Sequence, residues 1–276
     1  MPGPLDGRRV LVTGAGSGIG RALAVEAARR GASLCLSGRR ADALRETRTL
    51  LDPGQVHLVV PADITSEAGR AGITDSIGAA WGGLDILVNN AGVIAAGSLT
   101  AMPDETVLAM MSTNVTAPMF LTRDLVPLLE RGRSPRIVNI GSMLGEIPLA
   151  HFAAYSASKA AVKGVSVAMR RELRARNIAV TYAAPRTTAT DAAARLKAYV
   201  PEGKADSPER VARQIWRGVE QGRDHVYPSP AERLFMALQA LAPRMVDRFV
   251  TPRTSTIVPG HARTIDPIPS EDASHV

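Results

Sequence analysis

The sequence predicts an α/β protein built on a doubly wound parallel sheet of about seven strands with helices on both faces. Two observations carry this prediction. Short apolar runs, such as RVLVTG at 9–14, alternate along the chain with longer segments of helical periodicity. These runs are apolar throughout rather than at every second residue, which indicates strands buried on both faces. Right-handed connections between such strands then place helices on each side of the sheet.

The individual elements follow from the same two patterns. The expected strands cover residues 9–14, 33–38, 56–63, 84–90, 136–142, 179–185 and 225–228. The expected helices cover residues 20–30, 41–51, 66–81, 104–130, 155–176 and 208–221. The last of these has a clear start signal, because Ser207 precedes Pro208 and Glu209 follows. No linker divides this part of the chain, so residues 1–228 are expected to form one domain.

Composition narrows the class of protein. Hydrophobic residues make up 45% of the 276 residues, which is enough for a core and excludes disorder throughout. The net charge of +7 comes from scattered arginines, with no nucleic-acid motif, so a nucleic-acid partner is not expected. Cys35 is the single cysteine and the histidines lack ligand spacing, so no metal site is expected. We see no signal peptide and no membrane-spanning run, which favours a cytoplasmic location.

A glycine-rich turn follows the first expected strand. The segment TGAGSGIG at 13–20 has glycines at four alternate positions and leads into a helix. It does not have the G-x-G-x-x-G spacing. Glycines nevertheless let the backbone approach a pyrophosphate, and a helix amino terminus offers free N–H groups and a positive dipole. A flexible loop without a ligand is the alternative interpretation.

The end of the second expected strand indicates which dinucleotide is bound. An acidic residue at this place holds a ribose hydroxyl, whereas an arginine accommodates a 2′-phosphate. The strand ends in Gly38, Arg39 and Arg40, with no carboxylate. We therefore expect NADP(H) rather than NAD(H), with Arg39 on the phosphate. Two surface arginines at the start of a helix are the alternative, more so for Arg40.

Several motifs together carry a family resemblance. They are TGAGSGIG at 13–20, NNAG at 89–92, Asn114, Ser142, and YSASK at 155–159. In order and spacing this set, which runs from about Arg9 to Tyr227, resembles the short-chain dehydrogenase/reductase family. The resemblance implies a Rossmann-type fold and an oxidoreductase. It also implies a homodimer or homotetramer that associates through the helices at 104–130 and 155–176.

The resemblance assigns roles residue by residue. Asn114, Ser142, Tyr155 and Lys159 match the family's catalytic tetrad. Asp63 matches the adenine contact, with Ile64 beside it, and Thr190 matches a contact to the nicotinamide carboxamide. The implied cofactor-binding set comprises Gly14, Ser17, Gly18, Ile19, Gly20, Arg39, Asp63, Ile64, Asn90, Ala91, Gly92, Tyr155, Lys159, Pro185, Thr188 and Thr190. The family usually has Pro-Gly where this chain has Pro185-Arg186. An arginine here lacks the conformational freedom of glycine, and it could reach cofactor phosphates or an acidic substrate.

Tyr155 and Lys159 carry the expected chemistry. Residues four apart on a helix share a face. A free tyrosine has a pKa of about 10, and an adjacent ammonium favours the phenolate. We therefore expect Lys159 to lower the pKa of Tyr155, which would donate a proton to a substrate carbonyl oxygen. The resemblance implies that Ser142 hydrogen bonds this oxygen, and that Asn114 anchors a water linking Lys159 to solvent.

The expected substrate is a small hydrophobic carbonyl compound or alcohol. The residues expected to wall its pocket are mostly apolar: Ile94, Met143, Leu144, Ile147 and Phe152. Reduction of a ketone or aldehyde, or the reverse oxidation, is the expected reaction. Two alternatives stay open: a non-catalytic NADP(H)-binding regulator, and an NAD(H)-dependent alcohol dehydrogenase of the same fold.

The carboxyl-terminal part has a different pattern. Residues 229–258 are expected to form an amphipathic helical extension, with an apolar stripe over 230–250 that is flanked by arginines and bent at Pro243. Packing on the domain or on another subunit, peripheral contact with an anionic membrane, and docking of a partner protein are the three interpretations. Residues 259–276 are polar and proline-rich, and we expect a disordered tail.

Overall fold

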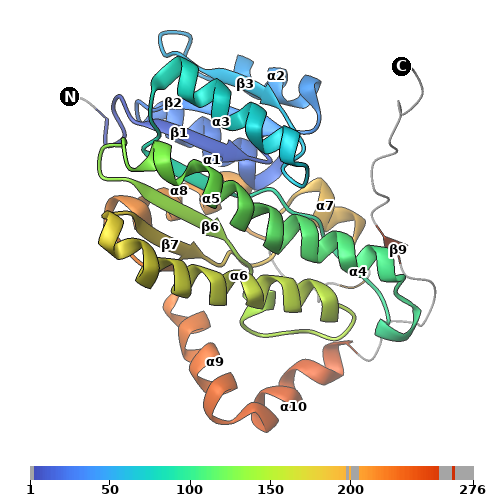
Figure 1. Ribbon diagram of the computed structural model, residues 1–276. Helices are drawn as coiled ribbons and strands as arrows, with labels where there is room; N and C mark the ends of the chain where they lie inside the picture. The colour runs from blue at the N-terminus through green and yellow to red at the C-terminus, as the bar shows by residue number, and fades with distance from the viewer. Residues whose placement is uncertain (1–2, 197–198, 200–204, 255–262, 265–276) are drawn as a thin grey trace, which may run out of the picture.

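A seven-stranded parallel sheet forms the centre of the molecule and confirms the predicted fold class (Figure 1). The computed structural model describes residues 3–196, 199, 205–254 and 263–264. The strands are β1 (Arg9–Thr13), β2 (Ser33–Gly38), β3 (Leu58–Pro61), β4 (Ile86–Asn89), β6 (Arg136–Ile140), β7 (Ala179–Ala183) and β8 (His225–Val226). They lie in the order β3-β2-β1-β4-β6-β7-β8. A further antiparallel pair, which the sequence did not predict, joins β5 (Ala95–Ala96) to β9 (Arg263–Thr264).

Helices cover both faces of the sheet, as expected. They are α1 (Gly18–Arg29), α2 (Ala41–Thr49), α3 (Glu67–Trp81), α4 (Asp104–Met111), α5 (Ala117–Leu129), α6 (Ala153–Glu172), α7 (Asp191–Arg195), α8 (Pro208–Glu220), α9 (Pro230–Leu241) and α10 (Pro243–Thr254). The single helix expected over 104–130 is in fact two helices joined by a π-helical turn at Ser112–Thr116. The short helix α7 has no apolar pattern of its own and was not expected.

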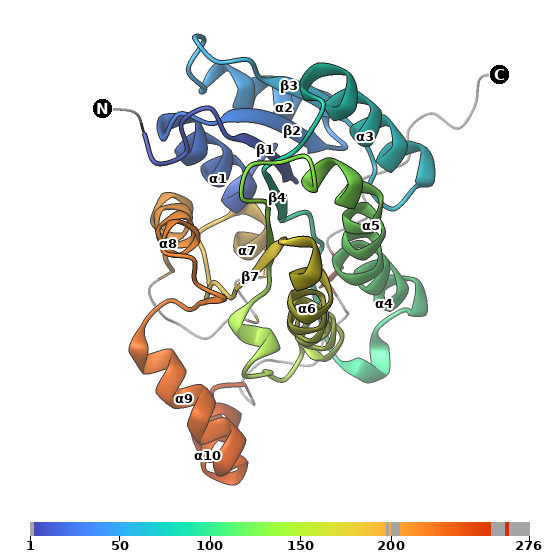
Figure 2. The ribbon, with the colours of Figure 1, turned by 60° about the vertical axis from the view of Figure 1, so that its left-hand side comes forward.

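The core has two layers, one on each face of the sheet. In β1, Val10 and Val12 belong to the cluster under α1 and α8, whereas Leu11 belongs to the cluster under α3 and α5. Figure 2 shows these two pairs of helices on opposite sides of the sheet. Side chains of one strand therefore fill both layers, which explains why the strand is apolar at consecutive positions, Val10 to Val12.

Two helices extend beyond the sheet at the carboxyl end of the domain. Helices α9 and α10 project away from the body of the molecule (Figures 1 and 2). The break between them falls at Ala242 and Pro243, where the sequence predicted it. No helix in the described part of the chain is long and apolar enough to cross a membrane. Of the tail predicted over 259–276, only Arg263–Thr264 are described, and the rest lies outside the described residues.

Asp85 ties the amino-terminal ends of the strands together. Its buried carboxylate accepts hydrogen bonds from Arg9 Nε at 3.1 Å and Arg9 Nη2 at 2.9 Å. It also accepts from the backbone N–H groups of Arg9 at 2.8 Å and Arg133 at 2.6 Å. Burial alone would raise the pKa of Asp85, but these hydrogen bonds lower it below its ordinary value. Asp85 thus joins β1 to the segments that precede β4 and β6.

The substitution Asp85→Ala is expected to lower the free energy of unfolding by about 3–5 kcal/mol, because it leaves a charged partner without its counterion. Because the folded-state pKa is depressed, the contribution of Asp85 is complete above the ordinary carboxyl pKa of about 4 and is lost as the pH falls below it. Urea denaturation at neutral and acidic pH measures this. Asp75→Ala, on the exposed face of α3, is the matched control. Equal effects of the two substitutions at neutral pH would contradict the role of Asp85.

Candidate active site

A cavity of about 590 Å³ opens at the carboxyl ends of the central strands. After β1 the chain builds β2 and β3 on one side and then returns to place β4 on the other. Ligands of doubly wound folds bind where the strand order reverses in this way. Most of the expected site residues line the cavity: Gly14, Ser17, Gly18, Ile19, Gly20, Asn90, Ala91, Gly92, Ser142, Tyr155, Lys159, Pro185, Thr188 and Thr190.

The glycine-rich turn forms one wall of this cavity. Gly14 and Gly18 have φ angles of +66° and +54°, a conformation that residues with side chains rarely adopt. A Cβ at Gly20 would lie 2.1 Å from the carbonyl oxygen of Gly14, so only glycine allows α1 to pack this closely. Helix α1 begins at Gly18, and the Ser17 side chain does not cap it. The turn therefore offers bare backbone and uncapped N–H groups, which fit the phosphates of a dinucleotide.

The turn after β4 is held against β1 by Thr13. The Thr13 hydroxyl accepts hydrogen bonds from the backbone N–H groups of Asn90 at 3.0 Å and Ala91 at 3.1 Å. The Asn90 side chain donates to the Thr13 carbonyl at 2.9 Å. This places Asn90, Ala91 and Gly92 beside the glycine-rich turn. Thr13 belongs to the glycine-rich sequence motif, but the motif alone predicted no role for its hydroxyl.

Asn114 lies behind the cavity, on the π-helical turn. Its side chain accepts from Val93 N at 2.8 Å and donates to Val93 O at 2.9 Å. It also donates to Ser158 Oγ at 3.0 Å. One buried amide thus joins the segment after β4 to helix α6. π-Helical turns inside α-helices are frequent at functional sites. The water expected at Asn114 stays a prediction.

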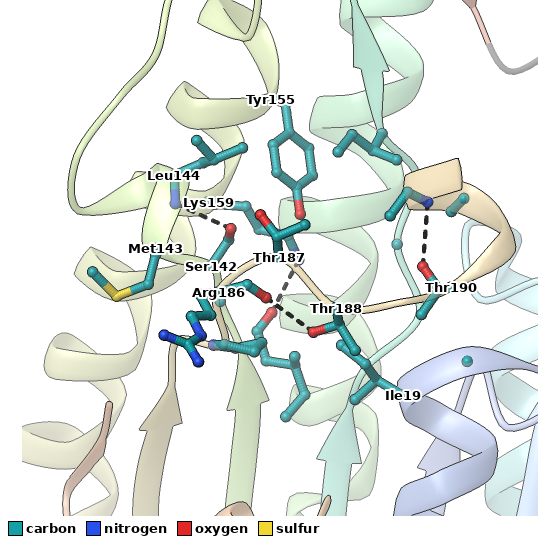
Figure 3. Close-up of a pocket in the computed structure, with 18 of the residues that line it drawn as sticks. Ile19, Ser142, Met143, Leu144, Tyr155, Lys159, Arg186, Thr187, Thr188 and Thr190 are labelled. Carbon is teal, nitrogen blue, oxygen red and sulfur yellow. Dashed lines mark hydrogen bonds between the residues drawn. The ribbon is translucent and has the colours of Figure 1, made fainter. Parts of the chain in front are cut away.

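Tyr155, Lys159 and Ser142 come together at the centre of the cavity (Figure 3). Tyr155 and Lys159 lie one turn apart on α6, and Lys159 Nζ is 5.9 Å from the centroid of the Tyr155 ring. Lys159 is buried and donates to the Ile140 carbonyl at 2.9 Å. The Ser142 hydroxyl accepts from Leu144 N at 3.1 Å. The structure therefore brings a phenol, an ammonium and a hydroxyl together in the same cavity.

Burial dominates the ionisation of this group. It raises the pKa of Tyr155 to about 12, although the nearby Ser142 hydroxyl acts in the opposite direction. It lowers the pKa of Lys159 to about 8. The pKa of Tyr155 therefore lies above its ordinary value and not below it as expected, because removing the phenolate from water outweighs the influence of its neighbours. At neutral pH Tyr155 holds its proton and Lys159 is mostly charged.

Four expected residues do not line the cavity. Arg39 is exposed at the end of β2, and its side chain forms no hydrogen bond or ion pair with another residue of the described part. Asp63 accepts two hydrogen bonds from Thr65, at 2.9 and 2.7 Å. The Ile64 side chain is packed in the core, which leaves only its backbone for a ligand. Asn114 is the fourth and acts from behind the cavity.

Arg186 is committed to acidic partners of this chain. It donates to both carboxylate oxygens of Asp206, at 2.7 and 3.0 Å, and to Glu232 at 3.3 Å. In Figure 3 its guanidinium points away from Tyr155 and from Thr190. The structure therefore directs Arg186 to Asp206 and Glu232 instead of to a cofactor phosphate or an acidic substrate. The partners lie 20 and 46 residues along the chain, where no local pattern connects them to Arg186.

The apolar wall is where the sequence placed it. Ile94, Met143, Leu144, Ile147 and Phe152 all line the cavity. Further lining residues were not anticipated from the sequence: Val93, Leu149, Thr187, Asp191, Ala192, Ala193, Leu196 and Glu232. Most of these follow β7 or belong to α7 and α9, which are elements that lie outside the motif pattern.

Comparison with known proteins places this geometry in a family. A family model described as short chain dehydrogenase matches residues 8–200. The chain is 32% identical over 263 residues to dehydrogenase/reductase SDR family member 7B of Bos taurus, covering 88% of this chain and 80% of that protein. It is 34% identical over 221 residues to the 3-oxoacyl-[acyl-carrier-protein] reductase FabG of Vibrio cholerae serotype O1, covering 76% of this chain and 89% of that protein.

A solved structure shows the same architecture with a cofactor bound. It is a short chain dehydrogenase/reductase from Burkholderia phymatum in complex with NAD. The two chains superpose with a TM-score of 0.80 and are 25% identical, covering 88% of this chain and 96% of the other. The motifs, the fold, the cavity and these relatives agree, and the chain belongs to the short-chain dehydrogenase/reductase family of oxidoreductases.

Proposed function

We propose that this protein is an NADP(H)-dependent reductase that converts a ketone or aldehyde to an alcohol, or catalyses the reverse oxidation, with Tyr155 as the general acid or base. The observation that carries the proposal is the meeting of Tyr155, Lys159 and Ser142 in the cavity that the glycine-rich turn also lines. A proton donor thus lies beside a cradle suited to a dinucleotide.

The residues around the cavity divide between binding and chemistry. The backbone at 14–20 would hold the phosphates, and the turn at 90–92 and Thr190 would hold the part of the cofactor nearer the reacting ring. A nicotinamide cofactor, when bound, supplies or accepts the hydride. The protein contributes the proton, the hydrogen bonds to the reacting oxygen, and a site that excludes water.

The proton comes from Tyr155. Its raised pKa keeps the phenol protonated at neutral pH, as a donor for carbonyl reduction must be. Ser142 would donate a hydrogen bond to the same carbonyl oxygen and so stabilise the charge that develops there. After transfer, the phenolate would be stabilised by the charge of Lys159, whose ammonium lies over the tyrosine ring. Transfer in the opposite direction makes Tyr155 the base.

The substrate class follows from the wall of the cavity. The wall that faces Tyr155 is mainly aliphatic and aromatic, which favours an apolar carbonyl compound over a sugar. The relative from Vibrio cholerae is named for reducing a 3-oxoacyl chain carried on a protein, and such a chain is apolar beyond its carbonyl groups.

The choice of NADP(H) is supported by Arg39. Its guanidinium is exposed at the end of β2, next to the strand that leads into the glycine-rich turn. No carboxylate stands at this place to hold a ribose 2′-hydroxyl. An NAD(H)-dependent enzyme is the second candidate, because the Burkholderia phymatum relative was solved with NAD.

Assembly and location are part of the same proposal. Leu108, Met119 and Phe120 expose 67%, 37% and 41% of their surface on α4 and α5, which supports a homodimer or homotetramer through these helices. Peripheral membrane contact through 230–250 and a cytoplasmic location stay predictions.

Tyr155→Phe is expected to lower turnover of a carbonyl substrate by about 10²–10⁴-fold, because it removes the proton donor and keeps the ring. Binding of NADPH is expected to stay near that of the parent protein. Loss of NADPH absorbance measures turnover, and a thermal shift measures binding. Tyr227→Phe removes the same hydroxyl outside the cavity and is the control. If Tyr155→Phe kept most of the turnover, another group would be the acid.

A parent protein that binds NADPH but turns over no carbonyl compound would favour the regulatory alternative.

Arg39→Ala is expected to weaken NADPH binding by about tenfold or more, because it removes charge-assisted hydrogen bonds to the 2′-phosphate. It should change NADH binding little, because NADH lacks this phosphate. Titration of each cofactor against the parent and the variant measures this. Arg45→Ala removes an exposed arginine that pairs with Asp42 and serves as the control. Tighter binding of NADH than NADPH to the parent protein would overturn the cofactor assignment.

A further inference from the structure

The first turn of α9 is fixed to the body of the enzyme. Ser229 caps the helix by accepting from Ala231 N at 3.2 Å. The preceding residues are held by Gln214 of α8, which donates to the carbonyl oxygens of Tyr227 at 2.8 Å and Pro228 at 2.6 Å. Farther along, α9 exposes 74% of Leu234 and 85% of Leu241. Only the beginning of this helix can therefore take part in the site.

Glu232 lies on that first turn and lines the cavity. Its carboxylate accepts from Arg186 at 3.3 Å and from the Ser229 hydroxyl. Arg186 in turn holds Asp206, a buried residue whose backbone bonds Thr187 and Ala189 at 3.0 and 2.9 Å. The three charged side chains join α9 to the segment after β7.

The charges around the cavity are unfavourable for an anionic substrate. In the described part of the lining, the cationic side chains are Lys159 and Arg186. Lys159 is buried and bonded to a carbonyl, and Arg186 is paired with two carboxylates. Asp191 and Glu232 add two negative charges. A substrate carboxylate would meet the like charges of Asp191 and Glu232, and Arg186 is already paired with carboxylates.

We propose that Glu232 is a specificity-determining residue, which makes the cavity prefer neutral carbonyl compounds over those that carry a carboxylate. Arg186 is a positioning residue, because it fixes Glu232 at the cavity and keeps its own charge paired. This inference rests on the proposed function, since it names the class of substrate that the same cavity accepts. It also gives the first turn of α9 a role in choosing the substrate.

Two probes that share one aryl ketone and differ at the para group test the proposal. Methyl 4-acetylbenzoate and 4-acetylbenzoate carry the same ketone and differ by one charge. The parent enzyme is expected to have the higher kcat/KM for the ester. Glu232→Gln removes the charge and keeps the shape, and it should raise the ratio of carboxylate to ester kcat/KM by about fivefold or more. Glu172→Gln makes the same change at the far end of α6 and should leave the ratio unchanged.

Binding separates this inference from the proposed function. Dissociation constants of both probes, measured by calorimetry with oxidised cofactor present, do not require turnover. If the enzyme reduces neither these ketones nor any other ketone or aldehyde with NADPH or NADH, the proposed function is contradicted, and the ratio of dissociation constants still tests Glu232. The specificity proposal is overturned if Glu232→Gln leaves both ratios unchanged, if the parent prefers the carboxylate, or if neither probe binds.

Arg186 has a separate signature. Arg186→Ala leaves the Glu232 carboxylate without its cation at the cavity. The KM for the carboxylate probe should therefore rise more than the KM for the ester. The kcat for the ester should change less than either KM. Arg186→Lys restores the charge but not the two-pronged contact with Asp206, and should recover the effect in part. Thermal unfolding identifies any loss of folding. Equal KM changes for the two probes would show that the ion pairs of Arg186 have only a structural role.

Discussion

A single buried amide, that of Asn114, constrains the rest of the site. It bonds both polar atoms of the Val93 backbone and the hydroxyl of Ser158, which is three residues beyond Tyr155 on α6. Leaving any of these groups without a partner inside the protein would be costly. Hydrogen bonds therefore set the distance between the turn after β4 and helix α6, which carries Tyr155 and Lys159. These hydrogen bonds have little freedom to lengthen. The π-helical turn is what brings this amide into reach.

The same helix is held to the sheet by a second chain of polar contacts. Asn89 on β4 donates to Thr122 Oγ1 at 3.1 Å and to Asn139 Oδ1 on β6 at 2.9 Å. Asn139 donates to Ser166 Oγ on α6 at 2.9 Å. These residues are buried, and contacts of this kind fix a unique packing where an apolar contact would allow sliding. Tyr155 and Ser142 come from different elements, so their proximity depends on this rigidity.

The sequence could predict features that are local or that repeat with a period. Uninterrupted apolar runs located the strands, and the four-residue spacing of Tyr155 and Lys159 placed both on one helix. It could not reveal the π-helical turn, because one extra residue in a helical turn leaves no periodic signal in so short a span. The two-residue strands β5 and β9 are too short to show a pattern, and the partners of Arg186 are distant along the chain. The pKa of Tyr155 depends on how far the fold buries its hydroxyl from water. The four-residue spacing between Tyr155 and Lys159 carries no information about this burial.

The exclusion of water links the chemistry to the choice of substrate. The burial that raises the pKa of Tyr155 and lowers that of Lys159 also makes an unpaired charge beside these two groups costly. In the proposed mechanism, a neutral substrate would leave the charge of Lys159 available when the Tyr155 phenolate forms, whereas a carboxylate would compete for that charge. Pairing Arg186 with Asp206 and Glu232 removes the other cation from that competition. In the proposed mechanism, the ion pairs of Arg186 and the burial of Tyr155 would serve the same end, which is to reserve the positive charge of Lys159 for the transfer of a proton.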